Sequence, residues 1–153
     1  MICLTFDTDY MSEKDMELFL STFSFPGKVT FFVHKRFPIL ESTIHEICPH
    51  PFIDDLHNWK KDVEEIVTQL RFCPNGVRTH SCVFSHKIAE GLKRLGFKYI
   101  SQAQNIFQTG LKPFRHPWGI WEIPIYYMDN MDFVISKNWP DIKHIPFSHE
   151  VIN

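Results

Sequence analysis

Segments with the period of a β-strand alternate with segments with the period of an α-helix along most of this chain. The alternation starts with an apolar run at residues 2–6 and a helical pattern at 13–23. Further strands are expected at residues 28–34, 43–48, 76–79, 97–101, 119–126, 133–136 and 142–147. Because strands that alternate with helices favour parallel pairing, the sequence predicts an α/β fold. It would be either a mainly parallel sheet or an incomplete α/β barrel.

The expected helices have start and stop signals. Ser12 followed by Asp15 is close to a capping box, and it precedes the helix at 13–23. A second helix is expected around residues 59–70, where apolar side chains share one face and charged side chains the other. Ser85 is a candidate cap for a third helix, which Gly96 would terminate.

Composition excludes several classes of protein. With 153 residues and 44% apolar content, residues 1–153 are expected to form a single domain with a sizeable core. The formal net charge of −2 gives no basic excess for binding nucleic acid. No stretch approaches the roughly 18 apolar residues of a membrane span. Because no signal peptide precedes the first strand, we expect a cytoplasmic protein.

The four cysteines are far apart in the sequence and have no paired spacing. This pattern is not that of a zinc knuckle, and without a secretory signal it does not indicate a disulfide framework. We therefore expect reduced thiols that are mostly buried. The residues are Cys3, Cys48, Cys73 and Cys82.

Several charged or metal-binding side chains directly follow expected strands. They are Asp7, Asp9, His50, Arg78 and His80. The carboxyl ends of parallel strands meet at one rim, where α/β proteins place their sites. Asp7 and Asp9 are two residues apart, so their side chains point the same way, and one could hold a cation while the other handles a proton.

These residues lie in motifs that resemble the NodB-like polysaccharide deacetylases, and most closely their WbmS-type branch. The motifs occur in the family's order at residues 5–9 (TFDTD), 45–52 (HEICPHPF), 77–81 (VRTHS), 111–129 and 145–149 (IPFSH). The resemblance implies an incomplete or distorted (β/α) barrel. It also implies metal-dependent removal of an acetyl group from an N-acetylated sugar of a polysaccharide or glycan precursor, such as those of bacterial surface polysaccharides.

The resemblance assigns Asp9 and His50 as metal ligands. The more common family pattern has a second histidine four residues after the first, but this chain has Asp54 there. We predict that His80 is the third ligand, with Asp54 and His57 as alternatives. One carboxylate and two imidazoles suit a divalent ion such as Zn²⁺.

The resemblance also assigns the catalytic groups. Asp7 would be the general base that takes a proton from the attacking water, and Arg78 would orient its carboxylate. His149 would be the general acid that protonates the departing amine, with Asp129 fixing its imidazole. The chain is short for the family and ends soon after the last motif, so it could be truncated at its C-terminus.

Three other functions fit parts of the sequence. A haloacid-dehalogenase-type phosphatase also begins with an apolar strand and D-x-D, but it wants Thr or Val where this chain has Met11. A glycosyltransferase normally carries D-x-D deep within a longer chain. A degenerate deacetylase domain that only binds glycans would be favoured by an incomplete metal site. The sequence leaves the sugar, the physiological metal and the oligomeric state open.

Overall fold

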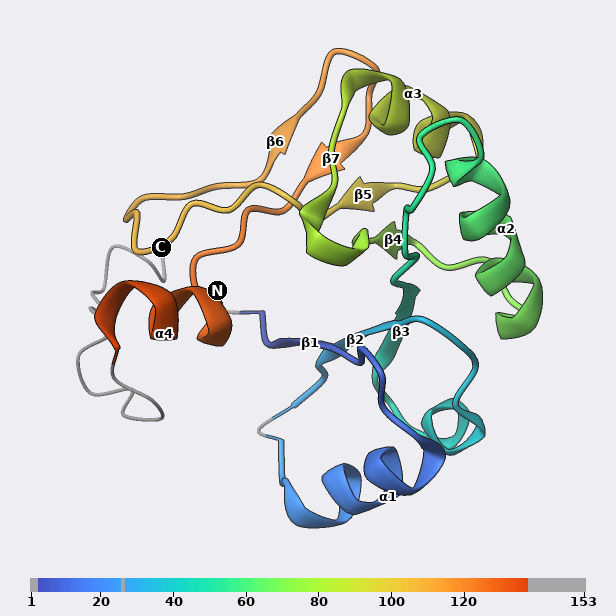
Figure 1. Ribbon diagram of the computed structural model, residues 1–153, viewed down its shortest axis with the longest axis vertical. Coiled ribbons are helices and arrows are strands. Elements are labelled where there is room, and N and C mark those ends of the chain that lie inside the picture. Colours follow the sequence, from blue (N-terminus) through green and yellow to red (C-terminus); the bar gives the residue numbers. More distant parts are fainter. Residues whose placement is uncertain (1–2, 26, 138–153) are drawn as a thin grey trace.

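The computed structural model describes residues 3–25 and 27–137, and it has an α/β architecture with two sheets (Figure 1). The first sheet has the order β1 (Thr5–Asp7), β2 (Thr30–Val33), β3 (Glu46–Pro49), and both pairings are parallel. The second has the order β4 (Gly76–Val77), β5 (Tyr99–Ile100), β7 (Trp121–Glu122), β6 (Phe114–Arg115). In the second sheet only β6 is antiparallel to its neighbour.

The helices follow the strands much as the periodicity predicts. The α-helices are α1 (Glu13–Thr22), α2 (Trp59–Leu70), α3 (His86–Arg94) and α4 (Asp129–Ser136), and the 3₁₀ turns are η1 (Pro38–Ser42) and η2 (His80–Cys82). The capping box is confirmed, because the Ser12 side chain accepts from the Asp15 backbone while the Asp15 side chain accepts from the Ser12 backbone. Ser85 caps α3 by accepting from the Ile88 backbone.

Backbone contacts join the two sheets at the carboxyl ends of β3 and β4. The Arg78 N–H donates to the Pro49 carbonyl at 3.2 Å, and the His80 N–H donates to the Pro51 carbonyl at 2.9 Å. The ends of β1 to β4 therefore face a common rim, as expected for an α/β fold. The strands of the described residues do not close into a barrel, because β1 and β6 each have a neighbour on one side only.

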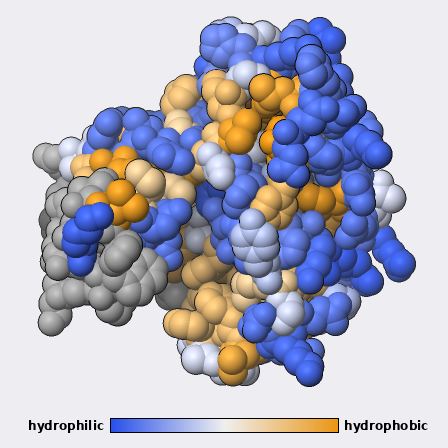
Figure 2. Space-filling view, viewed as in Figure 1, coloured by the Kyte–Doolittle hydropathy of each residue, from blue (hydrophilic) through white to orange (hydrophobic). Residues whose placement is uncertain are grey.

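Helix α2 connects two apolar cores. Its residues Trp59 and Val63 belong to the core beneath the second sheet and α3, whereas Ile66 and Leu70 belong to the core between the first sheet and α1. The opposite face of α2 is charged and exposed, and Figure 2 shows hydrophilic side chains over this helix. The amphipathic pattern of α2 thus stabilises the position of the two sheets relative to each other.

Two expected strands differ from the structure, and a third falls outside the residues that it describes. The expected strand at 133–136 was wrong, since these residues are the C-terminal half of helix α4. A four-residue apolar run does not distinguish strand from helix. The run at 133–136 directly follows residues 129–132, which are already helical, and it continues that helix. The strand expected at 119–126 is shorter, and the one at 142–147 lies outside the described residues.

The cysteines are free, but they are not mostly buried. Cys48 is buried and Cys82 is intermediate, whereas Cys3 and Cys73 are exposed. Cys3 precedes β1 and Cys73 lies between α2 and β4, so both are outside the helices and strands. Among the described residues no helix has the length and apolarity needed to cross a membrane.

Candidate metal centre

Asp9, His50 and His80 converge at the rim formed by the carboxyl ends of the strands. The Asp9 Oδ1 lies 2.8 Å from His80 Nδ1 and 3.2 Å from His50 Nε2. One ligand atom from each of the three residues lies within 4.8 Å of the others. Within the described residues, Asp9, His50 and His80 thus form a group that could hold a metal ion.

Each of the three side chains is placed by the end of a strand. Asp9 follows β1, where the Thr8 N–H donates to the Phe32 carbonyl at 3.0 Å. His50 follows β3 and its N–H donates to the Val33 carbonyl at 2.6 Å. His80 begins η2, just beyond β4. The parallel register of β1 to β3 and the contacts between β3 and β4 therefore bring residues far apart in sequence to one point.

The backbone is strained on either side of the cluster. Tyr10, directly after Asp9, has a φ of 59°, and Ser81 and Cys82, directly after His80, have φ values of 55° and 51°. Non-glycine residues rarely adopt this left-handed conformation, and it costs roughly 1–2 kcal/mol per residue. Such strain is concentrated at functional sites in proteins. Here it turns the chain sharply so that Asp9 and His80 face each other.

His50 is held in a form suited to metal binding. Its side chain is buried, and Nδ1 donates to the Arg78 carbonyl at 2.8 Å, which leaves Nε2 facing Asp9. Burial lowers the pKa of His50 below its ordinary value, although the Asp7 and Asp9 carboxylates oppose this shift. A neutral imidazole whose second nitrogen is hydrogen-bonded to a carbonyl is the usual arrangement of a metal-bound histidine.

The donor set fits a divalent ion. Ligands at 2.0–2.2 Å around a tetrahedral zinc ion are separated from one another by roughly 3.3–3.6 Å. The Asp9 to His50 separation of 3.2 Å is close to this value, and the Asp9 to His80 separation of 2.8 Å needs to widen only slightly. One carboxylate oxygen and two imidazole nitrogens, from three separate loops, therefore match the chemistry of such a site.

Asp7 lies beside this cluster and is held by Arg78. The Arg78 Nη1 donates to Asp7 Oδ1 at 2.8 Å and to Thr5 Oγ1 at 3.0 Å. Its other two nitrogens donate to the backbone carbonyl and hydroxyl of Ser101 at 3.0 and 2.8 Å. The guanidinium is buried and lies 4.2 Å from the centre of the Phe32 ring. The Asp7 carboxylate is thus oriented by a cation that is itself fixed on three sides.

The other predicted site residues lie apart from the cluster or cannot be placed. Asp54 and His57 are exposed and do not belong to the ligand group described above. Asp129 is exposed at the start of α4, where its Oδ1 accepts from the Asn130 N–H. His149 lies outside the described residues, so its expected pairing with Asp129 stays a prediction.

The sequence did not indicate several side chains that contact the predicted site residues. Thr5 and Ser101 share the Arg78 hydrogen bonds, and the rings of Tyr10 and Phe52 stand next to His80. Thr5 and Phe52 lie inside the motifs, and Ser101 ends an expected strand. Their position near the carboxyl ends of strands was therefore the signal that could have indicated these residues. Position at a strand end does not specify which side chain each of these residues contacts.

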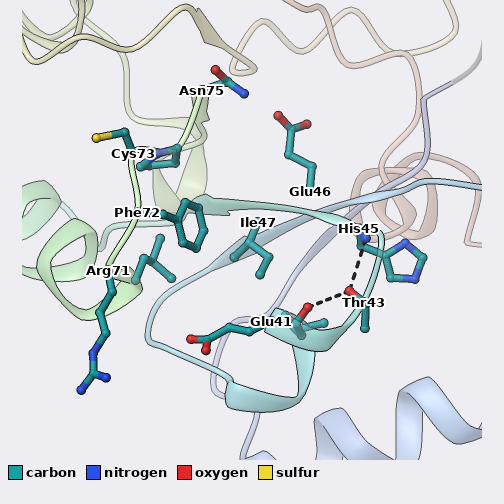
Figure 3. A pocket seen from close by; sticks show the side chains of 12 residues that line it. Glu41, Thr43, His45, Glu46, Ile47, Arg71, Phe72, Cys73 and Asn75 are labelled. Atoms are coloured by element: carbon teal, nitrogen blue, oxygen red, sulfur yellow. Dashed lines mark hydrogen bonds between the residues drawn. The ribbon is translucent and has the colours of Figure 1, made fainter.

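A cavity of about 440 Å³ lies away from this cluster, between the η1 to β3 segment and the connection from α2 to β4 (Figure 3). The side chains of Glu46, Phe72 and Asn75 are among those that line it, and Asp9, His50 and His80 are not. The cavity therefore does not contribute to the candidate metal centre.

Comparisons with known proteins agree with the resemblance seen in the motifs. The sequence profile of the family described as WbmS-like polysaccharide deacetylase matches residues 4–153. No curated protein matches the chain. Two solved structures share the fold, and the chain spans about three fifths of the length of each.

The first structure is a candidate polysaccharide deacetylase, WbmS, from Bordetella bronchiseptica, described as involved in O-antigen biosynthesis. It has a TM-score of 0.74 and 18% sequence identity, with 91% of this chain and 63% of that chain covered. The second is a candidate polysaccharide deacetylase from Mycobacterium smegmatis. It has a TM-score of 0.56 and 20% identity, with 82% of this chain and 58% of that chain covered.

Proposed function

Because the chain belongs to the WbmS-like polysaccharide deacetylase family, we propose that it is a metal-dependent hydrolase. The reaction is removal of the acetyl group from an N-acetylated sugar in a polysaccharide or glycan precursor. The observation that carries the proposal is the convergence of Asp9, His50 and His80 beside the Arg78-bound carboxylate of Asp7. The stated role of the Bordetella structure in O-antigen biosynthesis supports a surface-polysaccharide precursor as the substrate class.

Asp9, His50 and His80 would hold the divalent ion, for which zinc is the proposed identity. When bound, such an ion polarises an amide carbonyl and lowers the pKa of water to about 7. His50 presents Nε2 because its Nδ1 is hydrogen-bonded to the Arg78 carbonyl. Asp9 contacts both imidazoles, so it sets the distance between them.

Asp7 is the proposed general base. It lies two residues from Asp9 on the same strand end, and its carboxylate is one hydrogen bond from the buried Arg78 guanidinium. Arg78 holds the Asp7 carboxylate in one orientation, so that an oxygen is available to take the proton of the attacking water. Positioned bases of this kind contribute about 10²- to 10⁴-fold to a rate.

His149 is the proposed general acid, with Asp129 as its orienting partner, on the strength of the motif at 145–149. An amine leaves a tetrahedral intermediate only when it is protonated, so the reaction needs an acid in addition to the Asp7 base. We further propose that residues 1–153 form one domain.

The proposal is tested by acetate release from a panel of N-acetylated sugars and oligosaccharides, with Asp7→Asn and Asp9→Asn as a matched pair. Asp7→Asn should lower the rate by about 10²- to 10⁴-fold while the bound zinc per chain stays the same. Asp9→Asn should lose both zinc and activity.

Equal turnover of Asp7→Asn and the unmodified protein would refute the base assignment. Zinc binding without acetate release from any sugar, together with retained glycan binding, would favour the alternative of a glycan-binding module.

A further inference from the structure

Tyr10 is an exposed aromatic residue at the edge of the candidate metal centre. It directly follows Asp9, and 81% of its surface is exposed. Its φ of 59° places its backbone in the left-handed region. The side chain therefore projects from a sharp turn next to a predicted metal ligand.

Stability does not account for a tyrosine at this position. Glycine adopts a left-handed backbone without steric cost and asparagine at low cost, whereas a bulky side chain is strained there. The ring gains little from burial in return, since most of its surface is in solvent. A residue that is both strained and exposed is better explained by contact with something that binds at the site.

A second ring stands beside Tyr10. Phe52 comes from the loop after β3, two residues beyond His50, and its ring centre is 5.5 Å from that of Tyr10. The Phe52 ring lies 4.3 Å from the His80 ring at an interplanar angle of 30°, and the Tyr10 ring lies 6.4 Å from the same imidazole. Two aromatic side chains from separate loops therefore form a wall next to His80.

We propose that Tyr10 and Phe52 form a stacking wall for the pyranose ring of the N-acetylated sugar. The inference rests on the proposed function. One face of a pyranose carries several C–H bonds with slightly positive hydrogens, and the face of an aromatic ring is negative, so the two attract. A sugar that stacks on the wall has its substituents at the ring edge, where an acetamido group can extend toward Asp9 and the two imidazoles.

The position of the wall favours a sugar over other occupants. Because both rings are in contact with His80, whatever covers them also lies against the candidate metal centre. A second copy of this chain seated there would block that centre. The wall offers no positive charge of its own, so a phosphate group alone would have nothing to bind.

The proposal is tested by measuring binding of the methyl glycosides of N-acetylglucosamine and N-acetylgalactosamine. Saturation-transfer NMR on the zinc-loaded and the zinc-free protein reports which sugar protons touch the protein. The informative variants are Tyr10→Gly, which removes the ring and relieves the backbone, and Tyr10→Phe, which keeps the ring. Phe23→Ala is the control, because Phe23 is 54% exposed at the far end of α1.

Tyr10→Gly should weaken binding of the better glycoside about fivefold, the size expected from loss of one aromatic contact. It should also abolish saturation of the C–H protons on one ring face, with a melting temperature at or above that of the unmodified protein and unchanged zinc affinity. Tyr10→Phe and Phe23→Ala should bind as the unmodified protein does.

Unchanged binding by Tyr10→Gly, saturation confined to the acetyl methyl group, or no saturation of either glycoside by the unmodified protein would overturn the stacking proposal. A change in oligomeric state caused by Tyr10→Gly would also overturn it, in favour of a contact between copies of the chain. Acetate release is measured separately. Stacking without acetate release would refute the proposed function but not the stacking wall. Acetate release without stacking would refute the stacking wall but not the proposed function.

Discussion

Replacing Arg78 with lysine tests how the site holds its proposed base. The guanidinium donates to Ser101 on one side and to Thr5 and Asp7 on the other, and it stacks on Phe32. Lysine keeps the charge, but its single nitrogen cannot reach both sides. Losing the two bonds to Ser101, at about 1 kcal/mol each, and the stacking, at about 0.5–1 kcal/mol, should lower the free energy of unfolding by about 2–3 kcal/mol.

The effect on the reaction should be separable from the effect on the metal. The His50 Nδ1 is bonded to the Arg78 backbone carbonyl, which the substitution leaves in place, so zinc affinity should be unchanged. Acetate release should fall about 10²-fold, because a base displaced by about 1 Å is no longer aligned with its proton.

The change in the free energy of unfolding of Arg78→Lys is measured by urea unfolding, with Arg94→Lys as the control variant. Arg94 is an exposed partner of Glu90, so its replacement should change stability by less than about 0.5 kcal/mol. If Arg78→Lys were as stable as the Arg94→Lys control and retained full acetate release, the orienting role of Arg78 would be wrong.

Three further predictions concern the cysteines, the protonation of His50 and the cap of α1. Burial raises the pKa of the Cys48 thiol to about 12, so at pH 8 a thiol reagent followed by mass spectrometry should label exposed Cys73 quickly and Cys48 only after unfolding. Burial lowers the pKa of His50 in the folded state, so the unfolded chain binds more protons than the folded chain. The metal-free protein should therefore lose stability as the pH falls below the ordinary histidine pKa of 6.5. Urea titrations at several pH values should show a smaller loss of stability for His50→Asn. Ser12→Ala breaks the capping box with Asp15 and should cost about 1 kcal/mol in thermal unfolding, and an unchanged melting temperature would contradict the assigned cap.

The sequence predicted the elements whose signals are local. Helix α1 begins at its capping box, and the apolar residues of α2 have a period and a length that indicate a helix and not a strand. Where the signal was a short apolar run, as at 133–136, the prediction failed because a run of that length fits a helix as well as a strand. The pairing of β4 with β5 and of β5 with β7 depends on contacts between distant segments, which periodicity does not specify.

The residues that gather at the candidate site were predictable from the sequence, whereas their individual contacts were less so. The position of Asp9, His50 and His80 at strand ends correctly indicated one rim, and the structure joins His80, not Asp54 or His57, to the cluster. The departure from the common family spacing left that choice open in the sequence. The contact of Arg78 with Ser101 depends on the pairing of β4 with β5, and the contact of Phe52 with His80 depends on how the two sheets meet, so neither could be foreseen from the sequence.

The most direct test of the account is anomalous X-ray diffraction from crystals of the protein soaked in zinc. We predict a zinc peak at about 2.0–2.2 Å from an Asp9 carboxylate oxygen, His50 Nε2 and His80 Nδ1. Data collected on either side of the zinc absorption edge identify the ion. Zinc density that is absent from this cluster, or that lies elsewhere on the protein, would contradict the proposed metal centre and the hydrolase built on it.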